Sequence, residues 1–151
     1  MTTSHMRVLF IAALSAALLS TPPTAAIAQR PQATAPPAFI GLWNNTTHRL
    51  TVSAVVIDSG AGFDIDPPQI IERGARGYWI VRPSYVHTRS EGYVTYSVEN
   101  AYPAYAHVHW DARYTGPTNF DGQAGGLFTI TRTLAHGYTA EFQFNCVSPH
   151  C

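Results

Sequence analysis

Five consecutive residues, His107-Val108-His109-Trp110-Asp111, carry the side chains best suited to chemistry in this sequence. On an extended strand, residues two apart lie on the same face, so His107, His109 and Asp111 would line up together. Two imidazoles and a carboxylate could bind zinc or another divalent ion and leave one coordination position open. The simpler interpretation is a polar strand surface whose other face buries the valine and the tryptophan. We favour that interpretation and predict no bound metal and no cofactor.

Other catalytic arrangements have little support. The sequence contains no Gly-x-Ser-x-Gly elbow for a serine nucleophile, and no glycine loop leading into a helix that could hold a phosphate. Its two cysteines, Cys146 and Cys151, lie in the C-terminal tail, which is a poor position for a catalytic thiol. We therefore predict a binding protein and no catalytic residues.

The same two cysteines are candidates for a disulfide. In an oxidising compartment Cys146 and Cys151 would be expected to pair. The loop they close is short, and a chain-entropy estimate gives it about 2 kcal/mol of stabilisation. A bond between two chains is the alternative. A metal site made from Cys146, His150 and Cys151 would have too few ligands in too cramped a loop.

Residues 1–28 have the composition of a secretory signal peptide. Arg7 precedes an apolar run at Val8–Leu19 of about a dozen residues, which is too short to span a bilayer as a helix. Ala26-Ile27-Ala28 supplies the small-x-small pattern that a signal peptidase requires, so we expect cleavage after Ala28. A buried N-terminal helix is the alternative, but the two prolines that follow the run would end it. The mature protein is expected to be secreted, to the exterior or to a periplasm.

The charge of the mature chain excludes some partners. Removing Arg7 from the nine arginines leaves eight, with no lysine, against nine acidic residues, a net charge of about −1. Nucleic-acid binding normally requires a basic face, so we predict no nucleic-acid partner. The same balance argues against simple electrostatic adhesion to anionic lipid. Any contact with a membrane would depend on aromatic rings and specific head-group contacts.

The mature chain is predicted to form one all-β domain. Residues 29–38 are rich in proline and alanine and read as an extended linker, so the folded domain should occupy residues 39–151. Tyr93–Val98, Leu127–Thr133 and Gly137–Asn145 alternate apolar and polar residues with a period of two. Turn-forming residues separate such runs, which indicates a single-domain antiparallel β-sandwich of about seven or eight strands.

Aromatic residues beside the expected turns are the remaining functional signal. They can lie at a lipid–water boundary or stack on a sugar or choline group, although most rings in a small sandwich belong to the core. The aromatic residues next to turns are Phe63, Tyr85, Tyr102, Tyr105, Tyr114 and Phe120.

Several segments, read in order, resemble the aegerolysin family and the related small component of binary insecticidal crystal toxins. The similarity runs from about Gly41 to Phe144, and the ordered set is more specific than any one motif. The segments are Asn44-Asn45-Thr46-Thr47-His48-Arg49-Leu50, Asp58-Ser59-Gly60, Pro68-Gln69-Ile70-Ile71 to Gly74, Glu91-Gly92-Tyr93-Val94-Thr95-Tyr96-Ser97-Val98, His109-Trp110-Asp111 and Tyr114-Thr115-Gly116-Pro117-Thr118-Asn119-Phe120-Asp121-Gly122.

The resemblance implies a β-sandwich that binds a membrane lipid peripherally, as a cytolysin or toxin component that acts with a larger pore-forming protein. Carried over by position, it implies lipid-binding roles for Trp110, Asp111, Tyr114, Asn119 and Glu91. Asp111 would accept hydrogen bonds from a head group between the walls formed by Trp110 and Tyr114. The structural alternative places Trp110 in the core and uses Asp111 to cap a turn. The functional alternative is a secreted carbohydrate- or protein-binding module without membrane activity.

Overall fold

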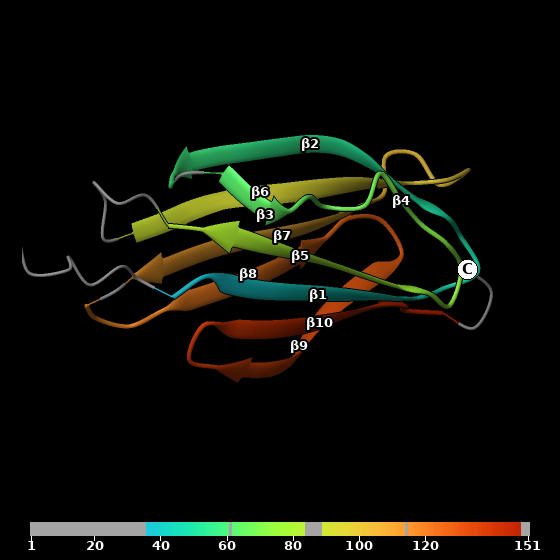
Figure 1. Ribbon diagram of the computed structural model, residues 1–151. Coiled ribbons are helices and arrows are strands. Elements are labelled where there is room, and N and C mark those ends of the chain that lie inside the picture. Colours follow the sequence, from blue (N-terminus) through green and yellow to red (C-terminus); the bar gives the residue numbers. More distant parts are fainter. Residues whose placement is uncertain (1–35, 61, 84–88, 114, 149–151) are drawn as a thin grey trace, which may run out of the picture. The chain divides into compact units, whose positions relative to one another are not determined.

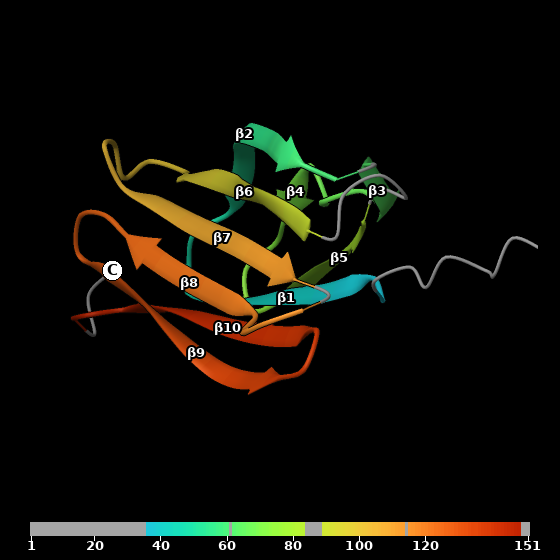
Figure 2. The ribbon, with the colours of Figure 1, turned by 90° about the vertical axis from the view of Figure 1, so that its left-hand side faces the viewer.

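The computed structural model describes residues 36–60, 62–83, 89–113 and 115–148 of the chain. Within these ranges it contains ten strands and no helix, arranged as two five-stranded sheets that form the layers seen in Figures 1 and 2. The predicted all-β sandwich is therefore confirmed. The number of strands exceeds the expected seven or eight, because β3 and β4 are short edge strands of four and two residues beside glycine and proline turns.

Each sheet brings together strands that are distant in sequence. In spatial order, the first sheet contains β3 (Gly62–Ile65), β5 (Arg76–Arg82), β1 (Ala38–Asn45), β10 (Thr139–Cys146) and β9 (Phe128–His136). The second contains β4 (Ile70–Ile71), β2 (Leu50–Ser59), β6 (Arg89–Val98), β7 (Tyr105–Arg113) and β8 (Asn119–Ala124). The last residue of the predicted linker, Ala38, is already buried in β1. The predicted signal peptide and the rest of the linker lie outside the described residues.

One strand pairing differs from the expected antiparallel pattern. β1 and β10 are parallel neighbours, with Phe39 opposite Thr139 and Asn45 opposite Asn145. The other pairs of described strands are antiparallel. Sequence periodicity identifies strands and their faces but carries no information on strand direction, so this pairing could not be predicted.

The core lies between the sheets and follows the predicted alternation. On β10 the buried apolar side chains are Ala140, Phe142 and Phe144, and on β6 they are Val94, Tyr96 and Val98. Aromatic rings join the two layers. Trp79 of the first sheet lies 6.5 Å from Tyr96 of the second, measured between ring centroids, and Phe63 lies 5.9 Å from Trp110.

Gly92 allows a particularly close approach within the second sheet. A Cβ atom at this position would lie 2.2 Å from the carbonyl oxygen of Val56 and 2.8 Å from the indole of Trp110. Glycine is therefore required for β2 to pass beside β6 and for Trp110 to fill the core beneath it.

The long hairpin of β6 and β7 defines two ends of the sandwich. Arg89 is paired with Arg113 at one end, and Ser97 with Tyr105 at the other, roughly 25 Å away at about 3.3 Å per residue. We call the first the charged end and define it by Arg89, Glu91, Asp111 and Arg113. We call the second the apolar end and define it by Tyr102, Leu127 and Val147.

Candidate functional site

The row of polar residues on β7 is placed as the sequence predicts. Val108 and Trp110 are fully buried, whereas His107 and His109 are half-buried on the opposite face of the strand. His107 Nδ1 lies 2.9 Å from Thr95 Oγ1, and His109 Nε2 lies 3.8 Å from a Glu91 carboxylate oxygen. Burial, and then the neighbouring His109, lower the pKa of His107. Among the described residues, no group of three His, Cys, Asp or Glu side chains is placed to hold a metal ion.

Asp111 is the central charge of the charged end. It is only 8% exposed, and its carboxylate accepts hydrogen bonds from Arg89 Nε at 2.7 Å and from Arg113 Nη2 at 2.7 Å. Burial alone would raise the pKa of Asp111, but the hydrogen bonds from Arg113 and Arg89 outweigh it and bring the pKa to about 2. The carboxylate is therefore ionised at any physiological pH, and it holds two arginine side chains in place.

Three of the five residues implied in lipid binding come together in one row at the charged end. Asp111 is paired with Glu91 on β6 and with Asn119 on β8. Trp110 points to the other face of β7 and is 0% exposed, as the structural alternative expected. Tyr114 lies outside the described residues. The lipid-binding role of this set stays a prediction.

The electrostatics of the row favour a structural use of its charges. Arg89 also forms an ion pair with Glu91, at 2.7 Å between Nη2 and the carboxylate. Hydrogen bonds to Asp111 raise the pKa of both Arg89 and Arg113. A ligand ammonium group that approached Asp111 would have to compete with two guanidinium groups that already form charge-assisted hydrogen bonds with it.

The apolar end has a different surface. Tyr102, Leu127 and Val147 are 98%, 66% and 67% exposed. They come from three separate segments: the β6–β7 connection, the β8–β9 connection and the residue after β10. The Val147 N–H group donates to the Leu127 carbonyl at 2.9 Å, and a hollow of about 350 Å³ has both Tyr102 and Leu127 in its lining. These large apolar side chains therefore form one exposed cluster.

Only some of the aromatic residues next to the expected turns are exposed and so available to a ligand or a lipid surface. Tyr102 is almost fully exposed at a loop tip, and Tyr105 is exposed at the start of β7. Phe120 is buried in the core and Phe63 packs against Trp110, because both belong to strands whose inner faces meet the opposite sheet. Tyr85 and Tyr114 lie outside the described residues.

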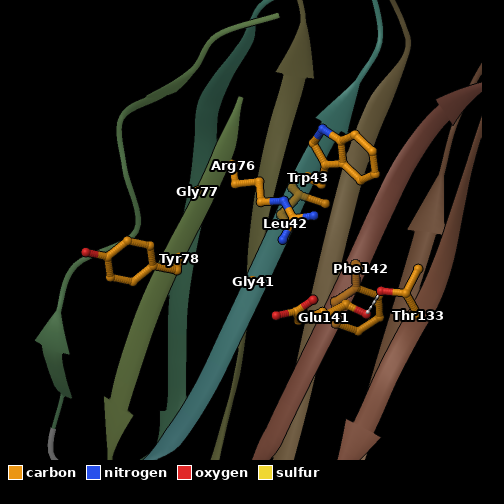
Figure 3. Close-up of a pocket in the computed structure, with 9 residues that line it drawn as sticks. All are labelled: Gly41, Leu42, Trp43, Arg76, Gly77, Tyr78, Thr133, Glu141 and Phe142. Atoms are coloured by element: carbon orange, nitrogen blue, oxygen red, sulfur yellow. Dashed lines mark hydrogen bonds between the residues drawn. The ribbon is translucent and has the colours of Figure 1, made fainter. Parts of the chain in front are cut away.

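A hollow on the outer face of the first sheet was not predicted from the sequence. It lies over Gly41 on β1, has a volume of about 310 Å³, and is lined by side chains of Trp43, Arg76 and Glu141 (Figure 3). Gly41 sits between Phe39 and Trp43 on the outward side of the strand, so the missing side chain leaves a gap in the row. The only sequence signal is this glycine inside an otherwise apolar run, Ala38-Phe39-Ile40-Gly41-Leu42-Trp43.

Two further expectations concern the tail and the membrane. Cys146 is the last residue of β10, but Cys151 lies outside the described residues, so the Cys146–Cys151 disulfide stays a prediction. In the described ranges, no helix is long and apolar enough to cross a membrane.

Comparison with known proteins establishes the fold and no closer relationship. No protein-family model matches the chain, and no curated protein matches it in sequence. Among solved structures, the chain is similar to the crystal structure of the lipid-binding protein Nakanori, with a TM-score of 0.58 over 74% of this chain and 71% of that chain. The two sequences are 11% identical, so the likeness shows a shared sandwich architecture.

Proposed function

We propose that this chain is a secreted lipid-binding protein that attaches peripherally to a membrane surface through its apolar end, and that it is not an enzyme. The observation that carries the proposal is the cluster of Tyr102, Leu127 and Val147, three large apolar side chains exposed together at the tips of three chain segments. None of these side chains belongs to the buried core.

Exposing such a cluster to water is unfavourable, and a bilayer surface would relieve the cost. Burying a side chain of this size is worth about 1.5–3 kcal/mol. Tyrosine is suited to the boundary, since its ring can enter the apolar layer while its hydroxyl group stays among the head groups. Adjacent exposed apolar groups commonly mark an interaction surface.

The charges near the cluster suit a membrane with little net charge. Arg49 pairs with Glu72 and Glu99, and Arg73 pairs with Glu99. Because these cations are matched by carboxylates, attachment would depend on apolar contact more than on attraction to anionic lipid. The likeness to a lipid-binding protein of the same architecture and the aegerolysin-like segments of the sequence support the same function.

The aegerolysin resemblance also implies that this domain acts together with a second protein, and we include that in the proposal. The domain would recognise the lipid, and a larger pore-forming protein would supply the pore. Vesicles loaded with a fluorescent dye should therefore stay sealed when the mature domain binds them alone. Dye release by the domain alone would contradict this division.

Co-sedimentation with vesicles tests the lipid-binding function. The mature domain, residues 29–151, would be mixed with vesicles of phosphatidylcholine, of sphingomyelin with cholesterol, or of phosphatidylglycerol. We expect binding to at least one of these compositions and at least ten-fold weaker binding for the double variant Tyr102→Ser/Leu127→Ser. Val55→Ser, which removes an exposed apolar side chain from the middle of β2, is the matched control and should bind as the wild type does.

The same assay separates the two ends of the molecule. If Asp111→Asn abolishes binding in a folded protein and the double variant does not, the lipid site is at the charged end, as the residues carried over from the aegerolysins imply. If no vesicle composition binds the wild type, the lipid-binding function is wrong.

A further inference from the structure

The hollow over Gly41 lies on a different surface from the apolar end. Across the first sheet, Gly41 is paired with Tyr78 on β5 and with Glu141 on β10, and Trp43 is paired with Arg76. Figure 3 shows the Arg76 and Glu141 side chains reaching toward β1 from the strands on either side of it. A second hollow of about 210 Å³ shares Gly41, Tyr78 and Glu141 with the first and extends it along β1 to Phe39. The result is a groove with an aromatic residue at each end and a glycine between them.

The walls of this groove are held in place before any ligand arrives. The Trp43 indole N–H donates to the Gly74 carbonyl at 3.2 Å, and the Arg76 guanidinium lies 5.0 Å from the centre of the Trp43 ring. Thr133 Oγ1 donates to the Glu141 carbonyl at 3.2 Å, which joins β9 to β10 beside the hollow. A preorganised surface loses less conformational entropy when it binds.

The groove contains one positive and one negative side chain, Arg76 and Glu141, and both can form hydrogen bonds with a ligand. Among the described residues, neither Arg76 nor Glu141 takes part in an ion pair. The guanidinium group can only donate hydrogen bonds and the carboxylate can only accept them. Hydroxyl groups do both, so a ligand with several hydroxyl groups can satisfy Arg76 and Glu141 at once without carrying a charge.

Other ligand chemistries fit less well. An acyl chain in the groove would bury Arg76 and Glu141 against hydrocarbon without hydrogen-bond partners, which is costly. A phosphate or carboxylate ligand would meet one arginine and an unpaired carboxylate of like charge. The C–H face of a ring, in contrast, can lie on the glycine floor and against aromatic walls, with its hydroxyl groups at the rim.

We propose that the groove over Gly41 binds the ring of a sugar or a closely similar cyclic polyol. The ring can come from the head group of a glycolipid or from a free glycan, and the chemistry of recognition is the same. The volume of the first hollow is at the lower end of the range for small-molecule sites, which suits one ring, and the extension toward Phe39 leaves room for a neighbouring unit.

A substitution that fills the groove without disturbing the fold is available. A Cβ atom at Gly41 would lie 3.5 Å from Glu141 Cγ and 4.0 Å from the Gly77 carbonyl oxygen, which are ordinary contacts. Gly41 is not among the glycines with a positive φ, and valine is favoured in strands. The Gly41→Val variant should therefore fold. Its unfolding temperature should be close to that of the wild type. Thr51→Val, on the exposed face of β2, is the matched control for adding valine to a sheet surface.

The test has a soluble arm and a membrane arm. In the first, methyl β-glucoside and methyl β-galactoside are titrated into the protein while tryptophan fluorescence and the backbone amide signals near Gly41 are followed. In the second, phosphatidylcholine vesicles with and without glucosylceramide or galactosylceramide are compared by co-sedimentation. We expect saturable binding that Gly41→Val abolishes, Glu141→Gln weakens by about ten-fold, and Thr51→Val leaves unchanged.

Each outcome decides the proposal. Binding of a free methyl glycoside that is lost in Gly41→Val supports it, with the sugar alone sufficient. A response only to glycolipid vesicles, lost in the same variant, supports it with the head group as the source. Equal responses of the wild type and Gly41→Val, or no response in either arm, overturn it. The apolar end is tested with sugar-free vesicles, so failure of one proposal does not imply failure of the other.

Discussion

The two ends of the sandwich use polar and apolar side chains in opposite ways. At the charged end, two arginines surround a carboxylate that is 8% exposed, and the ion pairs lie directly on the β6–β7 ladder. At the apolar end, the ion pairs of Arg49 and Arg73 are open to solvent, and large apolar side chains project beside them.

This difference separates residues that hold the fold from residues that are available to a partner. Asp111 has little capacity left for a ligand, since two guanidinium groups already occupy it. Tyr102 has no packing role within the described core, so nothing in the fold explains why a tyrosine stands there. Side chains that the fold leaves unexplained are the better candidates for function.

The largest expected effect is the loss of the buried carboxylate. Asp111→Ala leaves two arginines facing each other without their shared partner, and we expect the free energy of unfolding to fall by about 2–4 kcal/mol. Urea denaturation measures it. Leu127→Ser at the apolar end should change stability by less than about 0.5 kcal/mol, because the side chain is exposed. Equal losses in the two variants would contradict the contrast between the ends.

The pH dependence of stability sharpens the same contrast. The pKa of Asp111 is about 2 in the folded protein, below its ordinary value of 3.8, so the unfolded chain binds this proton more readily. The stabilisation is complete above about pH 5 and is lost as the pH falls through 4 toward 2, a change of about 2 kcal/mol. Asp111→Asn should lack this component. The measurement is urea denaturation at several pH values, and parallel curves for the two proteins would rule the component out.

The smallest effect is expected at the apolar end. The Arg73–Glu99 ion pair is 3.6 Å long, with the Arg73 side chain 63% exposed and the Glu99 side chain 35% exposed. Arg73→Ala should therefore change the free energy of unfolding by less than about 0.5 kcal/mol, and added salt should reduce that difference further. Thermal unfolding at low and high ionic strength checks it. A loss close to that of Asp111→Ala would mean that the two ends are not distinct in this respect.

Sequence periodicity was sufficient for longer strands such as β6 and β10 and for the face on which their apolar side chains lie, but not for the short edge strands β3 and β4. The side chains predicted to point inward on β6 are buried: Val94, Tyr96 and Val98. Alternate residues of a strand lie on opposite faces, so only one orientation of β6 turns all three toward the core. The polar face of β7 followed for the same reason.

The sites depended on contacts that sequence patterns do not encode. Asp111 meets Arg89 across the hairpin and Arg113 two residues ahead, and only the register of β6 and β7 reveals that both reach one carboxylate. The groove over Gly41 required the order β5–β1–β10, which brings Arg76 and Glu141 from distant parts of the chain to either side of one glycine. The exposure of Tyr102 was suggested by its turn, but the same reasoning failed for Phe120.

The parallel pairing of β1 with β10 has a consequence for how the molecule reaches its native state. β1 lies between β5 and β10, so the first strand of the domain lacks one of its two neighbours until Thr139–Cys146 has been synthesised. Forming a contact between strands about 100 residues apart in sequence carries an entropic cost, and proteins dominated by such contacts fold slowly. The first sheet is therefore complete around β1 only once β10 has joined it, whereas the β6–β7 hairpin forms from residues that are close in sequence.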